Sequence, residues 1–243
     1  MREGYGTFDL ALRKPVPGRA RRRGHAFKPP PLPAVSASRR TKGGLSARAV
    51  LVTVSTNMLA TSRIVFDPPL TEKVEAAARL PLGLADKLFL RLAHPEALPA
   101  DTHMLGSVSR AATGTYQLRP LGAPVVEAYF AGDLAHDLER EGKVAAFAFA
   151  GDELAAEFGA DIRKQLSVAA ISAWAAAPHI GGSYSYAESG ASDLRGLLAA
   201  PHDGRIFFAG EACSRTRYST AHGAYETGIA AADLIAESLS RKA

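Results

Sequence analysis

The chain has 243 residues, with 29 Lys and Arg against 24 Asp and Glu, a formal net charge of +5 and a single cysteine, Cys213. One cysteine excludes a disulfide framework and a thiolate metal site, and the chain has no run of about eighteen apolar residues that could span a membrane. We therefore expect a cytoplasmic protein with no metal site and no membrane partner.

The first 48 residues carry the excess positive charge of the whole chain. They hold 12 of the 29 basic residues, 2 of the 24 acidic ones and six of the fifteen prolines, so their net charge is +10 and that of the remainder is −5. This composition predicts disorder over residues 1–45. The segment could be a nucleic-acid-binding or membrane-binding tail, a transit peptide, a linker, or sequence translated out of frame. The abundance of Arg, Pro, Ala, Gly and Ser favours the last origin, and no nucleic-acid partner is expected.

Regular apolar patterns begin after residue 45. The β-branched run Ala49–Val54 predicts a buried strand. Phe66–Leu70 contains two prolines, which exclude helix there, and Thr71 is expected to cap a short helix that continues to Leu80.

The middle of the chain alternates between strand and helix patterns. Apolar and polar residues alternate from Lys87 to Leu92, which predicts a half-buried strand. Further strands are expected at 115–118 and 124–130, and helices at 132–141 and 152–166. Residues 167–173 then lead to Trp174.

The end of the chain has a short buried strand, a turn and a helix. The apolar run Ile206–Ala209 predicts the strand, and Gly210 breaks it. Thr220 is a candidate N-cap for a helix whose first turns contain mostly Gly and Ala. The positive end of such a helix, with no bulky side chains around it, suits a flat or anionic ligand.

These last two segments, Phe208-Ala209-Gly210-Glu211 and Thr220-Ala221 with the helix that follows, resemble the C-terminal signature of the FAD-dependent amine oxidases, the family of monoamine and polyamine oxidases. The resemblance implies that Gly210 and Glu211 lie beside the ribityl-phosphate part of FAD. It also implies that Thr220 and Ala221 meet the pyrimidine edge of the flavin. Alone, the segments could also be an ordinary strand and helix packed through small residues.

Two further motifs are similar to those of the same family. Trp174 is followed through Gly181-Gly182-Ser183 by Tyr184, which implies that Trp174 lines the flavin and that Tyr184 is an aromatic wall of the substrate site. An aromatic face attracts an approaching amine, although a lone Trp or Tyr usually serves core packing. Leu80-Pro81-Leu82-Gly83 precedes Lys87, which by the resemblance holds a water near flavin N5; alone, this lysine would be a solvated strand end.

The chain departs from the family pattern at two site positions. Ser183 stands where some monoamine oxidases attach FAD through cysteine, so the expected FAD is non-covalent. Thr220 stands where monoamine oxidases have their second aromatic wall, which leaves the substrate class open.

The largest departure is the absence of the N-terminal strand, Gly-x-Gly-x-x-Gly turn and helix that bind the ADP half of FAD. The resemblance covers roughly residues 46–240. It implies an α/β (α+β) fold, an incomplete two-lobed amine oxidase, with a partial FAD-binding lobe from 46–62 and 175–243 and a substrate-binding lobe from 63–174.

The function implied is oxidation of an amine to an imine, with reduction of O2 to H2O2, by a truncated oxidase that lacks part of its cofactor site. The alternative is a non-catalytic fragment or interaction module that pairs with a separately encoded N-terminal half. The expected partners are therefore a small amine and an N-terminal half of the same oxidase.

Overall fold

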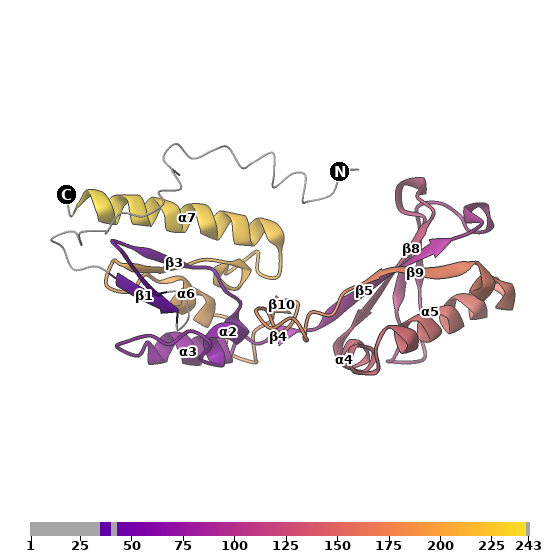
Figure 1. Ribbon diagram of the computed structural model, residues 1–243, viewed down its shortest axis with the longest axis horizontal. Helices are drawn as coiled ribbons and strands as arrows, with labels where there is room; N and C mark the ends of the chain where they lie inside the picture. Colours follow the sequence, from indigo (N-terminus) through magenta and orange to yellow (C-terminus); the bar gives the residue numbers. More distant parts are fainter. Residues whose placement is uncertain (1–34, 40–42, 242–243) are drawn as a thin grey trace.

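The computed structural model describes residues 35–39 and 43–241, which form two lobes joined at a narrow junction (Figure 1). We call residues 85–171 the sheet lobe. The helical lobe is built from the segments on either side of it, and its elements are β3 (Val50–Val52), α2 (Thr56–Ala60), α3 (Thr71–Ala78), α6 (Leu194–Ala199), β11 (Ile206–Phe208), the 3-10 helix η4 (Glu211–Cys213) and α7 (Ala221–Ser240).

An antiparallel hairpin of β1 (Val35–Arg39) and β2 (Gly43–Ala47) precedes β3. Disorder was predicted over residues 1–45; of these, residues 35–39 and 43–45 form backbone ladder bonds in the β1–β2 hairpin. The rest of segment 1–45 lies outside the described residues.

The helical lobe is centred on a parallel pair of strands. β3 and β11 pair in the register Val50 with Ile206 and Val52 with Phe208, and α7 lies along this pair (Figure 1). The buried cluster beneath the pair consists of Val52, Leu59, Leu70, Ala77, Leu80, Leu198, Phe208, Ala212 and Cys213. Leu70, Ala77 and Leu80 thus pack with the helical lobe, although they belong to the segment 63–174 that we assigned to the substrate-binding lobe. The assignment of functions to the two lobes stays a prediction.

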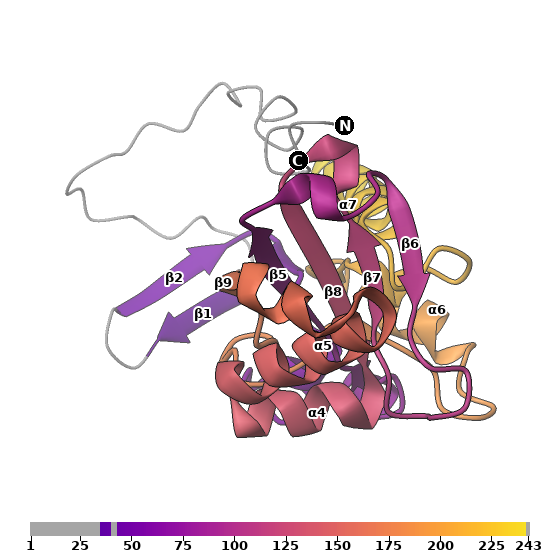
Figure 2. The same ribbon diagram turned by 90° about the vertical axis from the view of Figure 1, so that its right-hand side faces the viewer.

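The sheet lobe is one antiparallel sheet covered on one face. Its five strands lie in the order β6-β7-β8-β5-β9, and helices α4 and α5 cover one face (Figure 2). Residues at alternate positions, such as Leu88, Leu90, Val126 and Ala128, are fully buried under these helices. The lobe's elements are β5 (Ala85–Leu92), η1 (Pro95–Ala97), β6 (Thr102–Leu105), β7 (Thr115–Leu118), η2 (Pro120–Gly122), β8 (Val125–Ala131), α4 (Gly132–Glu141), α5 (Lys143–Phe158), η3 (Ala160–Gln165) and β9 (Leu166–Ile171).

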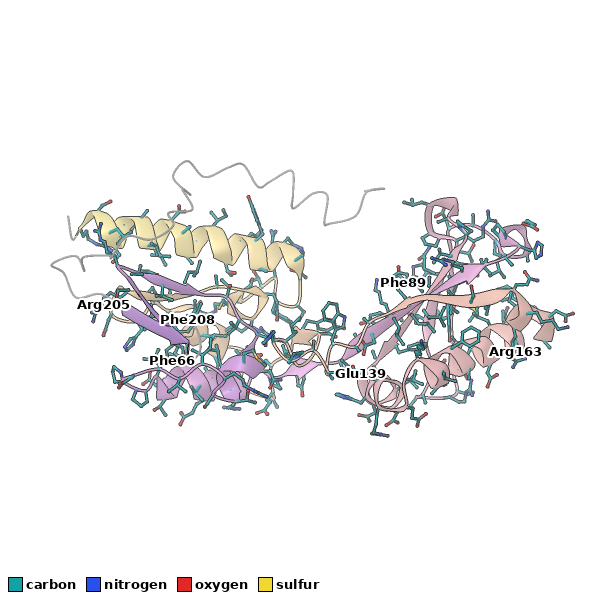
Figure 3. All side chains as sticks on the ribbon, viewed as in Figure 1. Phe66, Phe89, Glu139, Arg163, Arg205 and Phe208 are labelled. Carbon is teal, nitrogen blue, oxygen red and sulfur yellow. The ribbon has the colours of Figure 1, made fainter. Side chains whose placement is uncertain are left out.

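Two short strands form the junction between the lobes. β4 (Leu82–Gly83) pairs antiparallel with β10 (Tyr184–Ser185). Gly182, at φ +155°, precedes this pair, and a Cβ there would lie 2.6 Å from Cβ of Leu82, so the close approach requires glycine. Glu139 of α4 lies at the same junction (Figure 3), where its carboxylate accepts hydrogen bonds from the backbone nitrogens of Ala175 and Ala176.

The predicted mixture of helix and sheet is confirmed, and some predicted bounds need correction. The strand at 115–118 and the helix at 132–141 have the predicted bounds. The helix expected at 152–166 instead spans Lys143–Phe158, because Gly151 lies buried inside it and Gly159, at φ +87°, ends it. Thr71 is the first helical residue of α3 rather than its cap; Leu70 holds the N-cap position, and α3 ends at Ala78. Within 35–39 and 43–241, no helix has the length and apolar character needed to cross a membrane.

Candidate functional site

A cavity of about 240 Å³ lies at the carboxyl ends of the two parallel strands of the helical lobe. It is lined by the residues that follow β3, by Phe208–Cys213 and by Ala224 of α7. Ligands of α/β sheets bind outside the carboxyl ends of parallel strands, where loop backbone and helix starts converge. The position of the cavity therefore marks it as a candidate ligand site.

One side chain of the cavity lining favours a polar ligand. A Cβ added at Gly210, which has φ +137°, would meet no atom within 4 Å, but the backbone nitrogen and oxygen of Gly210 are both hydrogen-bonded to Oγ1 of Thr227, at 3.0 and 2.9 Å. Thr56 also lines the cavity, and its Oγ1 is buried without a hydrogen-bond partner in the described part of the chain. Buried polar atoms ordinarily have a partner, so Thr56 fits a ligand or water that completes its hydrogen bonding.

The start of α7 borders this cavity. Thr220 is its N-cap, as predicted, and Oγ1 of Thr220 accepts a hydrogen bond of 3.0 Å from the backbone nitrogen of Gly223. Ala221, the first helical residue, is exposed, and Ala224 lines the cavity one turn later. The positive end of this 20-residue helix thus lies next to Gly210 and Glu211.

The carboxylate of Glu211 joins three segments of the chain. Its Oε1 accepts from the backbone nitrogen of Ser185 at 2.9 Å, and its Oε2 accepts from Oγ of Ser185 at 2.8 Å and from the backbone nitrogen of Ser219 at 2.6 Å. Arg195, only 1% exposed, donates from NH1 to Oγ of Ser185 at 2.8 Å. Burial lowers the pKa of Arg195, and the nearby Glu211 carboxylate opposes this effect. Glu211 therefore fixes the floor of the cavity through bonds within its own chain.

A pair of tyrosines connects the two lobes. The hydroxyls of Tyr184 in β10 and Tyr129 in β8 lie 2.6 Å apart. Burial and this hydrogen bond raise the pKa of Tyr129 to about 12, so its hydroxyl is neutral near pH 7. Tyr129 lies directly opposite Lys87 in the sheet, and Lys87 Nζ forms an ion pair with Glu127 two residues earlier in β8.

Asp86 links Trp174 to the strand that carries Lys87. Its Oδ1 accepts from Oγ of Ser172 at 2.6 Å and from the backbone nitrogen of Trp174 at 3.3 Å. The backbone nitrogen of Lys87 donates to Oγ of the same Ser172 at 2.8 Å. Trp174, whose surface is 42% exposed, is thus anchored through its backbone beside the junction.

These contacts connect the predicted site residues in one series. Trp174 is bonded to Asp86, next to Lys87; Lys87 lies opposite Tyr129, which is bonded to Tyr184. Ser185, next to Tyr184, is bonded to Glu211, and Glu211 is bonded to Ser219, next to Thr220. The roles of these residues toward a flavin or a substrate stay predictions.

Several residues of this series were missed by the sequence analysis. Tyr129 and Glu127 carried a usable signal, because they alternate with buried residues of β8 and must therefore lie on the face opposite α4 and α5. No sequence signal pointed to Asp86, Ser185 and Arg195, because their hydrogen-bond partners come from distant segments.

His222 and Glu226, one turn apart in α7, do not pair with each other. Glu226 pairs with NH1 of Arg217 at 2.7 Å, and His222 is exposed. In the described ranges, no three His, Cys, Asp or Glu side chains gather closely enough to hold a metal ion.

Sequence comparisons identify relatives of the chain. Residues 33–236 match the family model described as flavin containing amine oxidoreductase. Polyamine oxidase 1 of Oryza sativa subsp. japonica is 35% identical over 233 residues, which cover 76% of this chain and 46% of that protein. Polyamine oxidase 3 of the same organism is 34% identical over 200 residues, covering 77% of this chain and 39% of that protein. The chain thus spans less than half the length of these curated relatives.

Solved structures share the fold. Putrescine oxidase bound to putrescine matches with a TM-score of 0.68 at 20% identity, over 84% of this chain and 46% of that one. Cyclohexylamine oxidase from Brevibacterium oxydans IH-35A matches with a TM-score of 0.63 at 20% identity, over 85% of this chain and 46% of that one.

Proposed function

Because the chain belongs to the family of flavin containing amine oxidoreductases, whose cofactor is FAD, we propose that it forms the flavin-facing part of an amine oxidase. The proposed reaction oxidises an amine to an imine; two electrons and two protons reach O2, which becomes H2O2. The names of the rice relatives favour a polyamine as the substrate. Since the chain spans less than half of those relatives, the activity is proposed for the oxidase in which this chain takes part.

The cavity at the carboxyl ends of β3 and β11 carries this proposal. The Thr56 hydroxyl, which has no partner in the described part of the chain, and the start of α7 together fit one polar, anionic portion of the cofactor. Its 240 Å³ is below the roughly 300–1,000 Å³ of complete small-molecule sites. Most of the FAD would therefore lie outside this cavity.

The proposal assigns a role to each of the remaining site residues. When bound, the flavin accepts a hydride equivalent from the carbon beside the amine nitrogen. Tyr184 and Trp174 present aromatic faces that attract and orient the amine. Thr220 and Ala221 bring the positive end of α7 toward an anionic cofactor edge, and Lys87 provides a cation that stabilises negative charge near the flavin.

Ser183 supports a non-covalent cofactor. Its hydroxyl accepts from the backbone nitrogen of Ala85 at 2.9 Å and donates to the carbonyl of Ala85 at 2.8 Å. The side chain at this position therefore serves the junction of the lobes, and its hydroxyl is engaged with backbone rather than directed to a ligand.

The test is a visible absorption spectrum of the purified chain, mixed with FAD and then desalted. We expect a weak retained flavin band, because the cavity fits only one portion of FAD, and bleaching of that band under anaerobic conditions when putrescine or spermidine is added. A folded chain, by circular dichroism, that retains no flavin would contradict cofactor binding by this chain alone. A retained band that no amine bleaches would contradict the oxidase proposal.

A second candidate function, a non-catalytic module that pairs with an N-terminal half, is favoured by the surface of the helical lobe. Parallel sheets are ordinarily covered on both faces, yet β3 and β11 form only a two-stranded sheet in which Leu51 is 37% exposed. Tyr225 and Ile229 of α7 are 56% and 49% exposed. A partner that adds strands and covers α7 would bury these apolar side chains.

This second function is tested by co-expression with a family polypeptide that contains the strand, Gly-x-Gly-x-x-Gly turn and helix. Co-purification that restores flavin retention would support it. The variant Ile229→Lys should weaken co-purification, because it removes exposed apolar surface. An equal yield of purified chain with and without the co-expressed polypeptide would contradict the pairing.

The cytoplasmic location is likewise retained as a proposal. Cys213 is a buried free thiol, and free thiols persist in reducing compartments. Fractionation of the source cells with an antibody against the chain would test it, and recovery outside the cytoplasm would contradict it.

A further inference from the structure

The face of the sheet lobe opposite α4 and α5 carries a charged pair near the junction. Lys87 of β5 and Glu127 of β8 both lie on this face, and Lys87 Nζ donates to Oε1 of Glu127. The side chains are 45% and 26% exposed, so the pair is partly shielded from solvent. Lys87 therefore has a carboxylate partner within its own sheet.

The sheet register shows in which direction this partner draws the lysine. Lys87 lies opposite Tyr129, whereas Glu127 lies opposite Phe89, two residues farther along β5. β5 begins at Ala85, which is bonded to Ser183 at the junction, and Phe89 lies out in the sheet lobe (Figure 3). Two residues of strand correspond to about 7 Å. The ammonium is thus held toward the outer part of the sheet, away from the helical lobe.

The other groups on this face do not compete for the ammonium in the same way. Tyr129, directly opposite Lys87, is bonded to Tyr184, and its hydroxyl is neutral near pH 7 because its pKa is raised. Arg91, farther along β5, faces the same side and has the same charge as Lys87. Glu127 is therefore the carboxylate that balances this lysine on the open face.

We propose that Glu127 is a positioning residue that restrains Lys87, holding its ammonium away from the flavin and reducing the positive charge it presents there. This inference rests on the proposed function, in which Lys87 stabilises negative charge near the flavin. A nearby carboxylate offsets the field of a cation, so loss of Glu127 frees both the side chain and its charge.

The first test needs no cofactor. The chain is acylated briefly with acetic anhydride at a fixed pH, and modification of each lysine is measured by mass spectrometry. Loss of a partly exposed ion pair in Glu127→Gln should increase acylation of Lys87 by about twofold to fivefold. Glu127→Asp should restore part of the protection. Lys164, paired with Asp161 on η3, is the internal reference, and Glu157→Gln on the exposed side of α5 is the matched control.

The second test measures flavin reoxidation by O2 after amine or dithionite reduction. Glu127→Gln should accelerate it, while the same substitution in a Lys87→Met background should have no effect, because Glu127 acts through Lys87. A structural role alone would not depend on the identity of residue 87.

The outcomes separate the two proposals. Unchanged acylation of Lys87 in Glu127→Gln overturns the restraint. Increased acylation with unchanged reoxidation, while Lys87→Met does slow reoxidation, also overturns it. If Lys87→Met reoxidises as the natural chain does, the role of Lys87 in the proposed function fails. If the chain binds no flavin, the proposed function fails. The role of Glu127 in that function is then overturned, and only its ion pair with Lys87 remains.

Discussion

At the scale of single residues, the site depends on a carboxylate, that of Glu211, whose oxygens both accept hydrogen bonds from within the chain. Glu211 accepts two hydrogen bonds from Ser185 and one from Ser219. The buried Arg195 donates a hydrogen bond to Oγ of Ser185. Charge-assisted bonds of this kind are stronger than neutral ones, and they leave the carboxylate little freedom to move. The cavity is therefore formed before any ligand arrives.

Substitution Glu211→Gln should lower the free energy of unfolding by about 2 kcal/mol, because an amide cannot accept from all three donors. Urea denaturation followed by circular dichroism measures this change. Glu226→Gln is the control: its pair with Arg217 is about half exposed on both sides, and its loss should cost less than about 1 kcal/mol. Equal effects of the two substitutions would contradict the structural role of Glu211.

Cys213 should be unreactive in the folded chain. It is 7% exposed, and burial raises the pKa of its thiol to about 12 from an ordinary 9.0. The folded state favours the neutral thiol, so this contribution to stability is present below pH 9.0 and is lost as the pH rises toward 12. A chromogenic disulfide reagent at pH 8 should react only after urea is added. Rapid reaction without urea would show that the thiol is accessible.

At the scale of elements, the start of α7 depends on one side chain. Thr220 Oγ1 accepts from the nitrogen of Gly223 and donates to the carbonyl of Arg217 at 2.6 Å. Its hydroxyl thereby fixes both the helix start and the loop before it. The positive end of the helix keeps its place beside the cavity for the same reason.

Thr220→Ala should therefore lower the free energy of unfolding by about 1 kcal/mol, the usual value of an N-cap. Thr220→Ser retains the hydroxyl and should remain close to the natural chain. Thermal and urea unfolding of both variants measure the difference. A serine variant as unstable as the alanine variant would show that the methyl group, and not the cap, matters.

Local signals in the sequence located most elements, but not the contacts between them. The run at Ile206 and the Thr220 cap were found because both depend on neighbours within a few residues. The start of α5 was missed: the helix begins at Lys143, nine residues before the predicted start, and Gly151 lies buried within it. Glu211 was predicted as a cofactor residue, but its bond to Ser185 joins positions 26 residues apart and leaves no local pattern.

At the scale of the whole molecule, the two lobes differ in how well they are covered. The sheet lobe has two helices over one face of five strands, whereas the helical lobe has two parallel strands and an α7 with exposed apolar residues. Large exposed apolar patches mark interaction surfaces or aggregation sites. The helical lobe is therefore where we expect this chain to associate.

Ile229→Lys should reduce self-association several-fold, as measured by sedimentation velocity, without lowering the melting temperature, because the side chain is 49% exposed. Ala232→Lys adds the same charge at an exposed position of α7 but removes no large apolar group, so its effect should be smaller. Identical association of both variants and the natural chain would place the contact elsewhere.

Val50 and Ile206 are paired in the sheet, and the entire sheet lobe lies between them in the sequence. Residues 85–171 can complete their hydrogen-bonded ladder while the C-terminal part of the chain is still being synthesised, since domains fold as units from the N-terminal side. β3 must wait for β11, because contacts of long sequence separation form slowly. In refolding followed by pulsed hydrogen exchange, amides of β5 and β8 should become protected before those of Val50–Val52. β3, which precedes the sheet lobe in the chain, thus finds its neighbour only after the sheet lobe has formed.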